Sequence, residues 1–289
     1  MSFQSTAAAP KLPFWATVGR CYATVFRNFG QLLRISWLWL LIMLPLYAIV
    51  HGLTWSPAME TAAPEGGILA LIISFLPNAV EFPVLASIAV AWHRLVLREE
   101  AVRGPFYLRL DSVVWRYALI LLVFFVLVAA PFVAATYSGI SAALLDPKMS
   151  LSAAATPGAV ATVIICLAAT LAIAGFLLPR LSLMLPAIAL GESLSAAAAW
   201  RVSGGNTWRL LWATLLCSVP LYVLLFAPVA MYFRDETQAS AALVGTIGSL
   251  ISVLIVTVGV TLLSLSYRHF ARQGDVGGSV PQPGEPAAA

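Results

Sequence analysis

The stretch 117–137, YALILLVFFVLVAAPFVAATY, contains twenty-one residues without a single charge. At a helical rise of 1.5 Å per residue it is about 30 Å long, which is the thickness of the hydrocarbon core of a bilayer. Its apolar residues are continuous, whereas the strands of a membrane β-barrel alternate polar and apolar residues. The stretch therefore predicts a transmembrane helix.

The composition extends this prediction to the whole chain. Of the 289 residues, 61% are hydrophobic and 10% are charged, which excludes both an ordinary soluble domain and a disordered chain. Further long apolar runs cover residues 33–53, 68–92, 160–178, 210–233 and 241–267. We expect an all-α fold with six membrane spans arranged as three hairpins.

The positions of the basic residues predict the topology. Fourteen of the sixteen Lys and Arg residues fall before the first run, after the sixth, or in alternate connections. The positive-inside rule then places both termini in the cytoplasm. We expect the protein to lie in the inner membrane of the cell. The topology also explains the net charge of +4, so no nucleic-acid partner is expected. The membrane domain is expected to cover 13–272, between an N-terminal tail (1–12) and a disordered C-terminal tail (273–289).

The chain also contains a candidate internal repeat. A shift of 175 positions places residues 30–47 on 205–222 with eight identities in eighteen positions, among them Arg34 on Arg209. The ends of the second and sixth runs match at the same shift. We interpret this as a parallel repeat of hairpins; chance similarity between leucine-rich helices is the alternative.

Residues 13–30 predict an amphipathic helix at the membrane interface. Its apolar positions recur every three or four residues, at Phe14, Val18, Tyr22, Val25 and Phe29. A weaker counterpart covers 192–202. Such helices would form an interfacial ring, either as a structural anchor or as a site for anionic lipid headgroups. The arginines placed there are Arg20, Arg27, Arg34, Arg201 and Arg209.

The second apolar run carries the polar residues that topology does not explain. Asn78 and Glu81 share a helix face, and Pro77 and Pro83 disturb the backbone beside them. A carboxyl group in a span indicates either an ion-coupled site or a buried group that fixes helix packing. Arg180, after the fourth run, would reach Glu81 only from a long or tilted span.

Motifs of enzymes and cofactor sites are missing from the sequence, which has no P-loop, HExxH, GxSxG or dinucleotide-binding turn. The three cysteines have no metal-binding or disulfide spacing, and the single histidines His51 and His93 are expected to be interface anchors. We expect no catalytic activity, no cofactor and no metal.

Residues 180–192 (RLSLMLPAIALGE) and 200–211 (WRVSGGNTWRLL) resemble an uncharacterised group of bacterial multi-pass inner-membrane proteins. Residues 20–45 and 92–97 resemble their other shared stretches. More distantly, residues 12–272 resemble the membrane domain attached to some glycerophosphodiester phosphodiesterases, whose catalytic domain has no counterpart here. The resemblance implies a membrane module with no established chemistry.

Two functional hypotheses follow from the sequence. The first is a membrane module that organises lipid or a partner membrane protein through its interfacial ring. The alternative is a small secondary transporter or channel that uses Asn78 and Glu81.

Overall fold

The computed structural model describes residues 11–54, 67–104, 107, 109–137, 157–232 and 238–271. The two tails and the connections 55–66 and 138–156 expected from the sequence lie outside these residues, apart from Lys11 and Leu12. The described chain is helical with no strand, as predicted. Its long helices are α2 (Phe29–Thr54), α4 (Gly67–Arg98), α5 (Ser112–Tyr137), α8 (Pro157–Ala172), α12 (Thr207–Tyr232) and α13 (Gln238–Ala271).

Five segments of the described residues are long and apolar enough to cross a membrane: Val80–Arg98, Ser112–Pro131, Ile164–Leu181, Thr207–Phe226 and Leu250–Phe270. Four of them lie in α4, α5, α12 and α13, and Ile164–Leu181 lies in the helical run that starts with α8. In α2, the shorter segment Phe29–Ile42 is apolar. The multi-pass character predicted from the sequence is therefore confirmed with five candidate spans, and a sixth span at α2 stays a prediction.

The apolar segment Ile164–Leu181 passes Arg180 and ends one residue later. After α8 the helix continues through a π-helical turn, η1 (Ile173–Leu177), into α9 (Leu178–Leu181). In η1 the N–H of Leu178 donates to the carbonyl of Ile173, five residues earlier. Pro179 follows at once, and its missing N–H cannot complete the next α-helical hydrogen bond, which accounts for the wide turn at this place. The next helix, α10 (Met184–Ala189), packs its buried residues against α4, α5 and α13.

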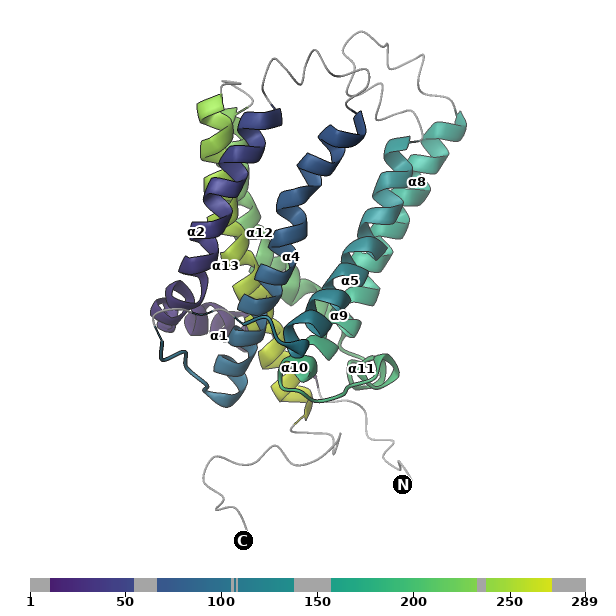
Figure 1. Cartoon of the computed structure of the whole chain (residues 1–289). Coiled ribbons are helices and arrows are strands. Elements are labelled where there is room, and N and C mark those ends of the chain that lie inside the picture. The colour runs from purple at the N-terminus through teal and green to yellow at the C-terminus, as the bar shows by residue number, and fades with distance from the viewer. Residues whose placement is uncertain are drawn as a thin grey trace.

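The helices α4 and α13 form the core of the bundle. More than half of the residues in their apolar segments are buried, whereas only 6% of the segment Ile164–Leu181 is buried. Both helices contact α2, α5 packs on α4, α12 packs on α13, and α8 packs on the outer side of α5 (Figure 1). Outward-facing apolar side chains on α5, α8 and α12, such as Leu171 and Phe226, are exposed, as expected for helices that face lipid tails.

The short helices gather at one end of the bundle, where α5 and α12 begin and α4 and α13 end (Figure 1). Here α1 (Phe14–Arg27) lies across the long helices and packs on α12 and α13. Its buried face consists of Thr17, Val18, Cys21 and Val25. Val18 and Val25 belong to the apolar face that the sequence predicted, and both are covered by protein, whereas Phe29 on the same predicted face is 43% exposed. The weaker counterpart is α11 (Ala196–Val202), where the Ser195 hydroxyl caps the helix by accepting from the N–H of Ala198.

Candidate functional site

Exposed tryptophans surround this end of the bundle. In the described residues, the five tryptophans that are at least 37% exposed lie on α1, on α11, or in the first six residues of α5 and α12: Trp15, Trp115, Trp200, Trp208 and Trp212. Exposed or half-buried arginines share these elements or the start of α2: Arg20, Arg27, Arg34, Arg116, Arg201 and Arg209. We call these eleven residues the collar. Tryptophan and arginine together are typical of the cytoplasmic membrane–water interface.

Two collar arginines also hold the fold together. Arg34 Nη1 donates to the carbonyl of Val102 at 3.0 Å, and Arg209 Nη1 donates to the carbonyl of Leu12 at 2.7 Å. These arginines are paired by the 175-residue shift, and both bind a backbone carbonyl from a different part of the chain. Arg20 bonds through Nε to its own helix. In contrast, Arg27 is exposed and forms no hydrogen bond or ion pair with any described residue.

Arg180 lies at the collar and contacts α11, α12 and η1. Its Nε donates to Thr207 Oγ1 at 2.6 Å, and the guanidinium carbon lies 4.1 Å from the ring centre of Trp200 and 5.0 Å from that of Phe176. The sequence grouped Arg180 with Asn78 and Glu81 as a candidate intramembrane site. In the structure its contacts are instead with Phe176 of η1, Trp200 of α11 and Thr207 at the start of α12.

Glu81 lies in the spanning part of α4. It is fourteen residues after Gly67 and twelve before His93, which correspond to about 21 Å and 18 Å along the helix. Its side chain is half-buried and has an interaction partner. Eleven residues separate it from Trp92, so the two lie about 20° apart on the helix, and Trp92 faces α13. The structure does not describe the side chain of Asn78, whose pairing with Glu81 stays a prediction.

A buried polar network joins α4, α5 and α13 at the level below Glu81. Trp92 Nε1 donates to Thr261 Oγ1 at 2.6 Å, and His93 is fully buried between Ser264 (2.7 Å) and Tyr117 (3.1 Å). The Ser264 hydroxyl donates to a backbone carbonyl of its own helix, so it accepts from His93 Nδ1–H. His93 Nε2 then accepts from the Tyr117 hydroxyl. The expectation that His93 is an anchor at the membrane interface is wrong, because His93 is buried inside the protein and its hydrogen bonds join three helices.

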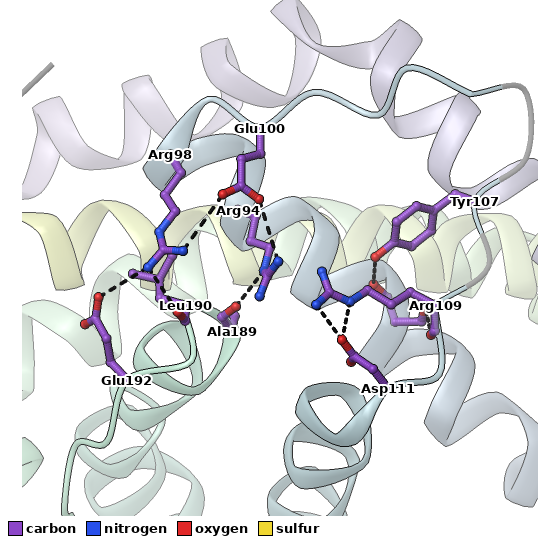
Figure 2. A network of polar contacts seen from close by, with 10 residues as sticks. Arg94, Arg98, Glu100, Tyr107, Arg109, Asp111, Ala189, Leu190 and Glu192 are labelled. Carbon is purple, nitrogen blue, oxygen red and sulfur yellow. Dashed lines mark hydrogen bonds and ion pairs between the residues drawn. The ribbon is translucent and has the colours of Figure 1, made fainter. Parts of the chain in front are cut away.

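Arg94 and Arg98 close this end of α4 onto α10. Arg94 Nε donates to the carbonyl of Ala189 at 2.8 Å, and Arg98 Nη2 donates to that of Leu190 at 3.0 Å (Figure 2). Both arginines pair with Glu100, and Arg98 also pairs with Glu192. Cations at these carbonyls complement the negative end of α10. The only sequence signal for this contact was the spacing of Arg94 and Arg98, which puts them on one helix face.

The connection before α5 is fixed by an ion pair. Arg109 Nε donates to Asp111 Oδ2 at 2.6 Å (Figure 2). Asp111 Oδ1 accepts from the N–H of Val114, in the first turn of α5. The hydrogen bond from Arg109 holds the pKa of Asp111 below its ordinary value. Ser87 on α4 donates to the carbonyl of Arg109, so the connection is fastened to the core. Asp at an N-cap was the sequence signal here.

In the described residues, no three His, Cys, Asp or Glu side chains are grouped so that they could hold a metal ion. Searches among protein families, curated proteins and solved structures find no match to this chain. The class of protein is indicated by the fold itself. Five apolar helices of membrane-spanning length indicate a multi-pass α-helical membrane protein.

Proposed function

We propose that this chain is a six-span inner-membrane protein with both termini in the cytoplasm, whose collar binds and organises anionic lipids. The observation that carries the proposal is the collar, where the exposed tryptophans of the described chain lie together with arginines at one end of the helices. Each arginine near an anionic surface contributes about 1 kcal/mol of attraction. In this topology α2 is the first span.

The position of α1 supports an interfacial collar. Cys21 Sγ donates to the carbonyl of Val258 at 3.2 Å, and Val258 is twenty residues after Gln238, where α13 begins. Twenty residues correspond to about 30 Å of helix, the thickness of the hydrocarbon core. With the start of α13 at one membrane surface, α1 therefore lies at the other.

The exposed side of α1 carries two kinds of residue on different flanks. Eleven residues separate Trp15 from Phe26, which places them about 20° apart around the helix axis. Arg20 and Arg27 lie a similar angle apart, and Arg27 is about 120° from Trp15. An in-plane helix with one aromatic and one basic flank can direct the first toward acyl chains and the second toward headgroups.

A lipid-competition experiment tests the proposal. The full chain is purified in detergent, and native mass spectrometry measures binding of phosphatidylglycerol against phosphatidylcholine. We expect preferential binding of phosphatidylglycerol and a reduced preference in the double variant Arg20→Gln/Arg27→Gln. The matched control, Lys148→Gln/Arg234→Gln, removes the same charge from the connections expected on the opposite side. Equal binding of the two lipids by the unmodified chain would refute the proposal.

The second candidate function is that of a small secondary transporter or channel with its site at Asn78 and Glu81. The half-buried carboxyl group of Glu81 within the span of α4 favours it. Its test is ion or proton flux in proteoliposomes containing a pH-sensitive dye. If the protein is a transporter or channel of this kind, Glu81→Gln abolishes the flux. The control Glu99→Gln changes an exposed acid after α4 and leaves the flux intact.

A further inference from the structure

We propose that Arg180 binds the phosphate group of an anionic ligand, which at this depth is the headgroup of a phospholipid. This inference rests on the lipid-binding function proposed above and assigns one specific site within it. Three side chains from η1, α11 and α12 surround Arg180, and each contributes a different constraint.

The guanidinium group of Arg180 is held in one orientation by its neighbours. Thr207 Oγ1 accepts the Nε–H at 2.6 Å, and the rings of Trp200 and Phe176 lie 4.1 Å and 5.0 Å from the guanidinium carbon. Trp200 and Phe176 also contact each other edge to face at 5.8 Å. An arginine that is fixed in this way loses little further conformational entropy when it binds a ligand.

One hydrogen-bonding edge of the Arg180 guanidinium group is unused among the described residues. Neither Nη1 nor Nη2 of Arg180 donates a hydrogen bond to any described residue. Two parallel N–H donors on a planar group match two oxygens of a phosphate, and arginine commonly binds phosphate in this bidentate manner. Stacking on the aromatic rings leaves this edge in the guanidinium plane available.

The positive charge of Arg180 has no carboxylate partner among the described residues. Arg94, Arg98 and Arg109 are each paired with a carboxylate, whereas no carboxylate of the described residues lies within ion-pair distance of Arg180. Arg180 is half-buried beside two aromatic rings, and a partly desolvated charge is normally compensated by a partner. Arg201 and Arg209, next to Trp200 and close to Thr207 in the chain, add further positive charge. The missing counter-charge is therefore expected from a bound anion.

The exposed tryptophans that follow Thr207 indicate the class of ligand. The exposed Trp208 and Trp212 follow Thr207 on α12 and are 67% and 54% exposed, as expected for residues at the headgroup level. Phosphodiester groups of lipids are concentrated at this depth. A soluble phosphate has the same recognition chemistry, so the experiment must separate the two sources.

The experiment measures the melting temperature and native mass spectra of the full chain with phosphatidylglycerol, with phosphatidylcholine, and with inorganic phosphate alone. We expect Arg180→Gln to weaken phosphatidylglycerol binding about tenfold or more, since a hydrogen-bonded charge is lost. The matched control Arg103→Gln removes the same charge from an exposed position outside the collar, and its binding is expected to stay within about twofold of the unmodified chain. Stabilisation by inorganic phosphate that disappears in Arg180→Gln identifies a soluble ligand, and stabilisation by the lipid alone identifies a headgroup site.

A second variant, Arg180→Lys, and the lipid preference of the unmodified chain complete the test. Arg180→Lys keeps the positive charge but cannot bind a phosphate in a bidentate manner. This variant replaces Arg180→Gln in the test if the glutamine variant does not fold. Binding of phosphatidylglycerol by Arg180→Lys at the level of the unmodified chain would overturn the assignment. Preference for phosphatidylglycerol that is unchanged in Arg180→Gln overturns the Arg180 site alone. If the unmodified chain shows no preference among the lipids, the site and the proposed function both fail.

Discussion

The buried hydrogen bond between Trp92 and Thr261 yields a quantitative prediction. Both side chains are fully buried, and Trp92 Nε1 donates to Thr261 Oγ1 at 2.6 Å. Thr261→Val keeps the shape of the side chain but leaves the indole N–H without an acceptor. The cost of an unsatisfied buried donor is about 1–3 kcal/mol in soluble proteins, and hydrogen bonds between membrane helices average about 0.6 kcal/mol. We expect a loss of about 1–2 kcal/mol in the free energy of unfolding.

The matched control is Thr257→Val, one turn earlier on α13. Thr257 is equally buried, but its hydroxyl donates only to the carbonyl of Val253 in its own helix. Its removal leaves no donor of another helix unsatisfied, so we expect a loss below about 0.5 kcal/mol. The assay is reversible unfolding by sodium dodecyl sulfate in mixed micelles, followed by circular dichroism. Equal losses in the two variants would show that the Trp92–Thr261 bond does not join α4 to α13 as described.

Three further predictions concern the end of the bundle where the collar lies. Arg109 lowers the pKa of Asp111 in the folded state. The stabilisation that this ion pair contributes is therefore complete above the pKa of Asp111 in the unfolded chain, and it is lost as the pH falls. Thermal melts should show that Asp111→Asn loses less stability than the unmodified chain from about pH 4 downward. The buried thiols of Cys21 on α1 and Cys217 on α12, two helices that pack together, should form a disulfide under mild oxidation with copper phenanthroline, detected by peptide mapping, and failure to link them would contradict the docking of α1 on α12. Arg209→Gln should destabilise the segment before α1 by about 1–2 kcal/mol, measured as faster hydrogen–deuterium exchange there; unchanged exchange would assign the anchoring to other contacts.

The long helices were the most predictable part of the fold. The uncharged stretch 117–137 lies within α5, and the apolar runs at 210–233 and 241–267 overlap α12 and α13 closely. Length and apolar composition suffice here because a backbone in lipid must satisfy its own hydrogen bonds. The helix at 13–30 was also expected, since its spacing is local information.

The partners of the polar side chains were not predictable in the same way. His93 meets Ser264 and Tyr117, which are 171 and 24 positions away in the chain, and no local pattern encodes such a pairing. The sequence made Arg180 a candidate partner of Glu81 only if the fourth span is long or tilted, and it left open where that span ends. The actual contacts of Arg180 depend on the turn after Leu181 and on how α11 returns to α12, and both are tertiary properties.

The contacts of the N-terminal segment have a consequence for synthesis. The N–H of Leu12 donates to Asn206 Oδ1, its carbonyl accepts from Arg209, and α1 packs on α12 and α13. Leu12 and Asn206 are 194 positions apart, which a ribosome covers in about 10 to 40 s at 5–20 residues per second. Throughout this time α1 exists without the helices that cover its apolar face. The first helix to be translated is therefore among the last to reach its final position. Until then we expect its apolar face to be bound at the membrane surface.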